Sequence, residues 1–69
     1  MELNTENIIT YLESLPDRGA SSYQILTYFN LEFSKLNHQI LSRQVQYKYK
    51  VKKTYVSIND RITTIYQLN

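Results

Sequence analysis

The periodicity of this chain changes near residue 47, and that change constrains the fold more than any other feature. Before it, apolar residues recur every three or four positions, which indicates amphipathic helices. After it, residues 47–52 alternate strictly, and two β-rich runs, 53–58 and 61–68, flank an Asn59-Asp60 turn. Runs of this kind joined by a short Asn/Asp turn predict an antiparallel hairpin. The order predicts an α+β fold with three helices followed by a C-terminal β-hairpin.

The first two helices have recognisable ends. One is expected over residues 4–15 and ends before Pro16, which cannot continue the helical hydrogen bonds. After a very short strand, the next helix is expected to begin at a capping box formed by Ser21 and Gln24, and to continue to about Phe29. The apolar stripes of these helices are Ile8, Ile9, Leu12 and Leu15 in the first, and Ile25, Leu26 and Phe29 in the second.

The third helix is expected over residues 33–46, and its two faces differ in composition. The predicted core-facing stripe consists of Phe33, Leu36, Ile40, Gln44 and Tyr47, with Leu41 at its margin. The predicted outward face consists of Lys35, His38, Ser42 and Gln46, with Ser34, Gln39 and Val45 at its edges. This outward face is polar and weakly basic, and it carries no acidic residue.

The pairing of the two C-terminal strands stays open at this point. A two-residue and a three-residue loop would pair different side chains, and neither gives one purely apolar face. The adjacent residues Lys52 and Lys53 are compatible with a β-bulge.

The length and composition exclude several classes of protein. Sixty-nine residues predict a single domain, 1–69, with a small core. The absence of cysteine excludes disulfides and thiolate chemistry, and fits a cytoplasmic protein. No apolar run approaches the roughly 20 residues that span a bilayer, and residues 1–4 do not resemble a signal peptide.

The sequence also offers no sign of catalysis. It contains no HExxH motif, no Gly-rich phosphate loop and no paired-carboxylate spacing. His38 is the single histidine, and a catalytic or metal-binding role would need convergent partners. A protein that is not an enzyme, with no metal and no cofactor, is therefore expected.

Charge is distributed unevenly along the chain. Residues 1–33 carry −4, from Glu2, Glu6, Glu13, Asp17 and Glu32 against Arg18. Residues 34–69 carry +6, from Lys35, Arg43, Lys48, Lys50, Lys52, Lys53 and Arg61 against Asp60. Such asymmetry favours a surface that binds phosphates or an acidic partner, with a chance split in a short chain as the alternative.

The element order resembles that of the winged helix-turn-helix DNA-binding family. The resemblance rests on the opening segment 7–12, the start of the second helix at 21–26 and the closing strand 64–68 with its aromatic residue. Small bacterial regulators of pilus operons and winged helices of the Z-DNA-binding type are similar in size and layout. The resemblance covers nearly the whole chain, but in spacing rather than in a specific motif. The chain departs from the family in having a Tyr/Lys-rich strand after the third helix, without the glycine that often ends that helix.

The resemblance implies which residues would contact double-stranded DNA. The third helix would lie in the major groove and present Ser34, Lys35, His38, Gln39 and Ser42. The hairpin would be the wing, whose cations Lys48, Lys50, Lys52, Lys53 and Arg61 contact the phosphate backbone. Alternate lysines on a strand share one side, so residues 48, 50 and 52 could follow one backbone.

Each of these interpretations has a structural alternative. The polar side of the third helix would also suit an ordinary solvated surface, and lysines also protect an edge strand from pairing with other molecules. Near the lysines, Tyr47, Tyr49 and Tyr55 would stack on bases or, more often for tyrosine, fill a small core.

The leading hypothesis is a DNA-binding transcriptional regulator, of the kind carried by phages, plasmids or mobile elements. A single module makes few contacts with DNA, which favours a homodimer or a protein partner bound beside it. The alternative is a protein-interaction module that modulates a host polymerase, nuclease or repressor through its acidic first half or its basic hairpin. A titration of duplex DNA at two salt concentrations separates the two hypotheses.

Overall fold

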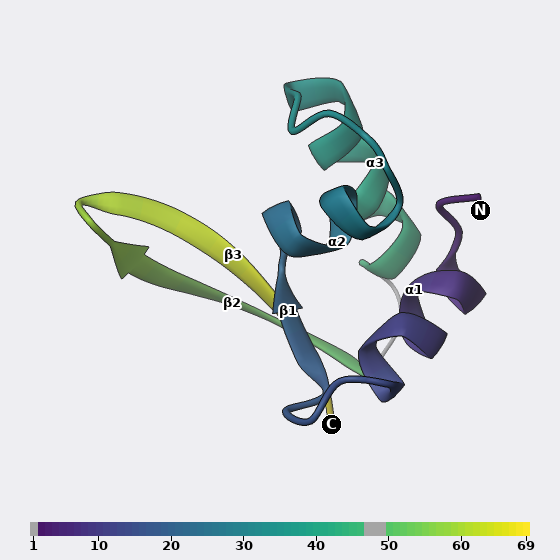
Figure 1. Ribbon diagram of the computed structural model, residues 1–69. Coiled ribbons are helices and arrows are strands. Elements are labelled where there is room, and N and C mark those ends of the chain that lie inside the picture. The colour runs from purple at the N-terminus through teal and green to yellow at the C-terminus, as the bar shows by residue number, and fades with distance from the viewer. Residues whose placement is uncertain (1, 47–49) are drawn as a thin grey trace.

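Over the residues it describes, 2–46 and 50–69, the computed structural model folds into three helices and a three-stranded antiparallel sheet (Figure 1). The elements in chain order are α1 (Thr5–Glu13), β1 (Gly19–Ser21), α2 (Ser22–Tyr28), α3 (Lys35–Val45), β2 (Val51–Ile58) and β3 (Arg61–Leu68). The strand order is β1-β3-β2, so β3 is central. The predicted α+β order of three helices and a C-terminal hairpin is confirmed, and so is the short strand before the second helix.

The helix starts follow from local capping groups. Asn4 caps α1, because its side-chain oxygen accepts a hydrogen bond from the backbone N–H of Asn7 at 2.8 Å. The predicted capping box of α2 is present. The Ser21 hydroxyl accepts from the backbone N–H of Gln24 at 3.1 Å, and the Gln24 side-chain oxygen accepts from the N–H of Ser21 at 2.9 Å.

The connection between α2 and α3 is equally local. Asn30 adopts a left-handed conformation with φ of 61°, and the N–H of Leu31 donates to the carbonyl of Leu26 at 2.9 Å. This Schellman arrangement satisfies the last carbonyls of α2 and ends the helix. Ser34 then caps α3 by accepting from the backbone N–H of Asn37 at 3.1 Å. α3 therefore begins after Phe33 rather than at it.

The hairpin closes through a two-residue loop. Asn59 and Asp60 have φ of 51° and 65°, the left-handed values that a type I′ turn needs at both positions. Pairing then runs unbroken from Ile58 opposite Arg61 to Val51 opposite Leu68. The hypothesis of a bulge at Lys52 and Lys53 is therefore wrong. The two lysines are ordinary successive strand residues, so they lie on opposite faces of the ribbon.

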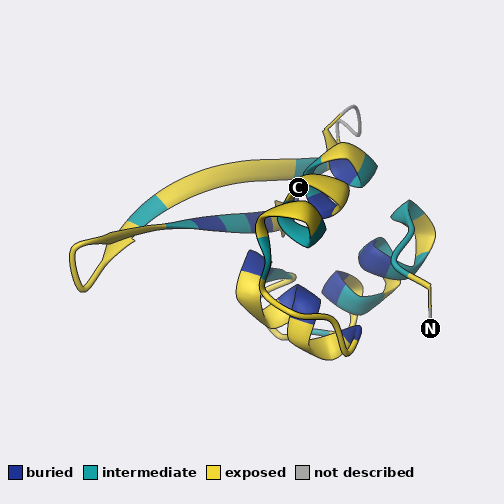
Figure 2. Ribbon diagram, turned by 90° about the horizontal axis from the view of Figure 1, so that it is seen from above, coloured by how far each residue is buried: buried dark blue, intermediate teal, exposed yellow. Residues whose placement is uncertain are grey.

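The core lies between the helices and one face of the sheet near the base of the hairpin. The buried apolar residues are Ile8, Leu12, Ala20, Ile25, Leu26, Phe29, Leu41, Val45, Tyr66 and Leu68. Thr64, Tyr66 and Leu68 alternate along β3, which identifies the face that the helices cover. The distal part of the hairpin extends away from this core and is mostly exposed (Figure 2).

The orientation of α3 differs from the one expected. Leu41 and Val45 are buried, whereas Leu36 is 66% exposed and Phe33 is 58% exposed. The predicted core stripe was therefore wrong for Phe33 and Leu36, and Ile40 is also mostly outside the core at 38% exposure. Val45, expected at the outward edge, is buried instead. The helix carries two apolar stripes, and packing against residues distant in the sequence selects the shorter one.

Candidate nucleic-acid interface

Among the described residues, a direct polar contact joins the hairpin to α3. The Nζ atom of Lys53 in β2 donates a hydrogen bond to the Oγ atom of Ser42 in α3 at 3.2 Å. Lys53 pairs across the ribbon with the buried Tyr66, so its side chain lies on the helix-facing side. The same Nζ atom lies 5.6 Å from the centroid of the Tyr55 ring, which shares that side. A cation of the hairpin is thereby placed beside α3.

Tyr66 lies beneath this contact. Its ring is fully buried, and among the described residues its hydroxyl is buried without a hydrogen-bond partner. Ser42 lies close enough to lower the pKa of this hydroxyl, although the two hydroxyl groups do not meet hydrogen-bond geometry. Burial raises the pKa of Tyr66 above 10, and the positive charge of Lys53 opposes that shift only in part. The phenol therefore stays neutral at physiological pH and provides no negative charge beside Lys53.

One shallow groove gathers most of the helix residues proposed from the sequence. Its lining consists of Phe33, Ser34, Lys35, His38 and Gln39, and its volume is about 380 Å³. Lys35 and Gln39 are exposed, whereas Ser34, His38 and Ser42 are half-buried. Ser34 also has a structural task as the cap of α3. We call this the reading groove.

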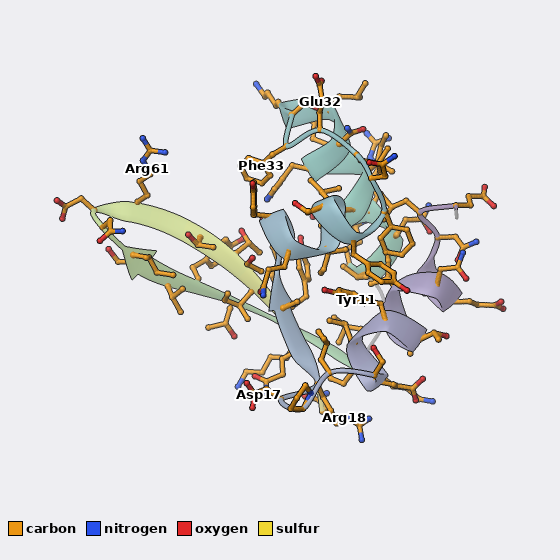
Figure 3. All side chains as sticks on the ribbon, viewed as in Figure 1. Tyr11, Asp17, Arg18, Glu32, Phe33 and Arg61 are labelled. Atoms are coloured by element: carbon orange, nitrogen blue, oxygen red, sulfur yellow. The ribbon has the colours of Figure 1, made fainter. Side chains whose placement is uncertain are left out.

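The cations of the hairpin do not all lie on one side. Lys52 pairs with Gln67 on the ribbon face opposite to Lys53, while Arg61 lines a groove together with Phe33 and His38. Figure 3 shows the Arg61 side chain projecting from the hairpin on the same side as Phe33. The structure thus brings Lys53 to α3 on the helix-facing side of the ribbon. By strand alternation Arg61 shares the face of Gln67 and Lys52, but near the hairpin tip it lines a groove with Phe33 and His38.

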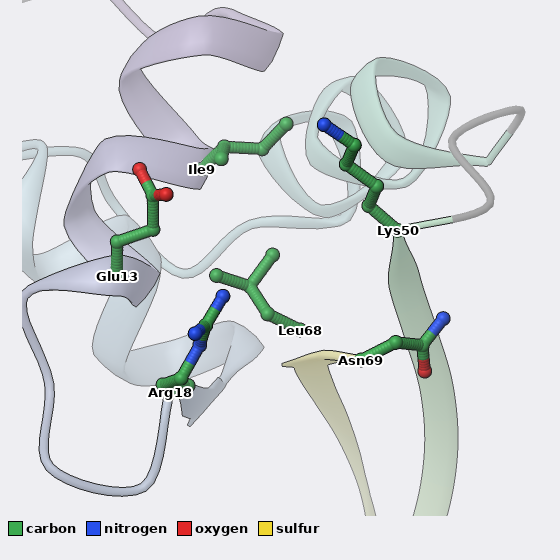
Figure 4. A pocket seen from close by; sticks show the side chains of 6 residues that line it. All are labelled: Ile9, Glu13, Arg18, Lys50, Leu68 and Asn69. Atoms are coloured by element: carbon green, nitrogen blue, oxygen red, sulfur yellow. The ribbon is translucent and has the colours of Figure 1, made fainter.

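The remaining lysines have different surroundings. Lys50 precedes β2 and lines a pocket of about 410 Å³ with Ile9, Glu13, Arg18, Leu68 and Asn69, next to α1 (Figure 4). There a carboxylate and two cations share one site, so Lys50 is not part of an all-basic surface. Lys48 lies outside the described residues, as do Tyr47 and Tyr49.

Sequence reasoning missed two residues at this surface. Arg43 is exposed on α3 and lies four residues after Gln39, so the helical spacing alone places it on the same side. Phe33 was assigned to the core, yet it is exposed between two grooves. For Arg43 the spacing from Gln39 carried the signal, but the same helical spacing also places Arg43 on the side of Leu36 and Ile40, which were expected in the core.

The charge of this surface follows from composition. α3, β2 and β3 contain Lys35, Arg43, Lys52, Lys53 and Arg61 and no acidic residue. The nearest acids in the sequence are at the borders of these elements, with Glu32 before α3 and Asp60 in the hairpin turn. A surface with these donors and cations can bind a polyanion and can hydrogen-bond to base edges.

Metal-ligand clusters and membrane-spanning helices are both absent from the part of the chain that the structure describes. Among residues 2–46 and 50–69, no three His, Cys, Asp or Glu side chains lie close enough together to hold a metal ion. Within the same residues, the helices are all too short or too polar to cross a bilayer.

The fold and the surface together define a class, a small α+β domain with a basic face made by one helix and a hairpin. No family model, curated protein or solved structure matches this chain significantly.

Proposed function

We propose that this chain is a winged helix-turn-helix protein that binds duplex DNA. α2 and α3 form the helix-turn-helix, α3 enters the major groove, and the β2-β3 hairpin is the wing. The observation that carries the proposal is the hydrogen bond from Lys53 to Ser42, because it joins a wing cation to the DNA-facing side of α3. The absence of acidic residues from α3 and both strands supports the same interpretation.

The side chains divide into two roles. Lys35, Arg43 and Lys53 neutralise phosphates and set the position of the protein on the duplex. The amide of Gln39 has the donor and acceptor geometry that adenine presents in the major groove, and Ser42 donates to a phosphate or to a base. Specificity therefore depends on Gln39, and overall affinity depends on the cations.

The biological role that fits this small module is transcriptional regulation without catalysis. One copy makes few contacts with DNA, so a homodimer or a neighbouring protein supplies the remaining affinity. A phage, plasmid or other mobile element is the proposed source, and the cytoplasm is the proposed location.

A salt titration with two matched variants tests the proposal. Wild-type protein is titrated into labelled duplex DNA at about 50 mM and 200 mM salt, and affinity should fall at least about tenfold because counterion release drives binding. Lys53→Ala should weaken binding to all sequences and lower the salt slope by about 1. Lys52→Ala removes the same chemistry one residue away on the opposite face of the ribbon, so its effect should be clearly smaller.

Two outcomes contradict the proposal at different levels. Equal losses in the Lys52 and Lys53 variants would show that the helix-facing side of the ribbon is not the DNA side. An absence of binding by the wild-type protein at about 50 mM salt would reject duplex DNA as the partner.

One observation favours the second candidate, a protein-interaction module. Leu36 and Ile40 lie four residues apart on the outward surface of α3 and are 66% and 38% exposed. Exposed apolar side chains that are neighbours on a helix suit a protein surface better than phosphates. Under this alternative the wild-type protein binds no duplex DNA, so the same titration decides between the two functions.

A further inference from the structure

A second groove lies beside the reading groove, and its lining is aromatic. It has a volume of about 200 Å³ and runs between the start of α2, the segment before α3 and the distal part of β3. Its principal lining residues are Tyr23, Phe33, His38, Arg61, Ile62 and Thr63. We call this the aromatic groove.

Phe33 packs edge-to-face with two other rings of this groove. The Tyr23 and Phe33 centroids lie 5.6 Å apart at an interplanar angle of 69°, and those of Phe33 and His38 lie 5.9 Å apart at 85°. Edge-to-face contacts cover little of a ring face, and Tyr23 and Phe33 are each 58% exposed. Apolar ring area is thus presented to the solvent in a concave site, where a flat ligand could cover it.

The charges of the groove select the kind of ligand. Arg61 supplies a guanidinium at one end, Thr63 supplies a hydroxyl, and none of the residues that line the groove is acidic. An acidic or neutral partner is favoured, and the combination of open aromatic faces with a fixed cation suits a planar ring that carries a phosphate.

We propose that the aromatic groove takes up an unstacked nucleotide base of the bound DNA. This inference rests on the proposed DNA-binding function, because Phe33 and His38 line both the aromatic groove and the reading groove. A duplex held by Lys35 and Gln39 therefore has its neighbouring nucleotides next to the rings. The base stacks on Tyr23 and Phe33 while Arg61 holds the adjoining phosphate.

The energy of stacking predicts a preference for imperfect duplexes. A fully paired base must be unstacked and unpaired before it can enter, whereas an unpaired base is already available. Stacking on an aromatic side chain contributes about 1–3 kcal/mol per base, which corresponds to at least about a fivefold gain in affinity. DNA with a bulge should therefore bind more tightly than the same duplex without it.

The test compares two labelled duplexes of the same sequence, one fully paired and one with a single unpaired base at its centre. Binding is followed by fluorescence anisotropy at fixed salt. The wild-type protein should prefer the bulged duplex by at least about fivefold. Tyr23→Leu should bring this ratio close to one and leave affinity for the paired duplex unchanged, because Tyr23 does not line the reading groove.

Tyr28→Leu is the matched control. Tyr28 belongs to the same helix, is 48% exposed, and stacks on Tyr11 of α1 outside the aromatic groove. This variant should keep the preference for the bulged duplex. Circular dichroism of both variants confirms that the helices are intact before the ratios are compared.

The outcomes separate this inference from the proposed function. Equal wild-type affinity for both duplexes would overturn the inference alone. Binding of the bulged duplex only, with the preference lost in Tyr23→Leu, would support the groove and contradict duplex reading by α3. An absence of binding to either duplex would overturn both and leave a protein ligand as the occupant of the groove.

Discussion

Tyr66 connects the core of this protein with its proposed binding face. The ring is fully buried among apolar residues, and the hydroxyl ends near Lys53 and Ser42, the two residues that join the hairpin to α3. Among the described residues, this hydroxyl is a buried polar atom without a hydrogen-bond partner. A buried group of this kind costs free energy of folding, because it has lost its hydrogen bonds to water.

Replacement of Tyr66 by Phe tests that statement. The change keeps the ring and removes the unpaired hydroxyl, so the free energy of unfolding at neutral pH should stay the same or rise by up to about 1 kcal/mol. Urea denaturation of both proteins measures the difference. A loss of more than about 1 kcal/mol would mean that the hydroxyl has a partner in solution.

The pH dependence of the same pair gives an independent check. Burial raises the pKa of Tyr66 in the folded state above its ordinary value of 10. As pH rises through 10, the unfolded chain ionises first, so the wild-type protein loses stability there. Tyr66→Phe lacks this contribution, and its stability should fall less steeply above pH 10.

At the scale of elements, the orientation of α3 decides which side chains are available for binding. Leu41 is fully buried, whereas Leu36, on the same helix and of the same type, is 66% exposed. Leu41→Ala should lower the free energy of unfolding by about 2–5 kcal/mol, since it leaves a cavity in the core. Leu36→Ala should change it by no more than about 0.5 kcal/mol, as expected of an exposed position.

Thermal or urea denaturation of these two variants measures the rotation of the helix directly. If Leu36→Ala were the more destabilising change, α3 would present its Leu41 side outward, and the reading groove would not exist as described.

Features governed by neighbouring residues could be predicted from the sequence. The capping box of α2, the end of α1 before Pro16 and the position of the hairpin turn each depend on a few adjacent residues. The rotation of α3 could not be predicted in this way, because the helix has two apolar stripes. The choice between them depends on distant partners, such as the hydrogen bond from the Thr5 hydroxyl to the backbone carbonyl of Gln44.

The helix residues of the candidate site could be predicted from the sequence, but the positions of its strand residues could not. The residues of the reading groove on α3 follow from helical spacing, and the structure gathers Ser34, Lys35, His38 and Gln39 in one groove. The side on which a residue of the hairpin lies depends on the pairing register of β2 and β3. The length of the Asn59-Asp60 loop sets that register, and the sequence alone left this length open. The register places Lys53, rather than Lys52, on the side of α3, whereas Arg61 is linked to α3 only through the groove that it lines with Phe33 and His38.

At the scale of the whole molecule, the hairpin extends away from the helices, and α2 and α3 lie above it in the view of Figure 1. Lys53 lies on the helix-facing side of the hairpin, Arg61 lines a groove with Phe33 and His38, and Lys35 and Arg43 are exposed on α3. Of the acids in the N-terminal half, Glu6 and Glu13 belong to α1 and Asp17 to the turn that follows it, whereas Glu2 precedes α1 and Glu32 precedes α3. This uneven distribution of charge would orient the protein in the electrostatic field of a DNA duplex before contact.

The most direct test of this account is a map of amide NMR shifts on addition of duplex DNA at low salt. The account predicts that the largest changes occur at Lys35, Gln39, Arg43, Lys53 and Arg61, with small changes in α1. Changes confined to α1 and the pocket around Lys50, or an unchanged spectrum, would contradict the claim that α3 and the hairpin form one DNA-binding face.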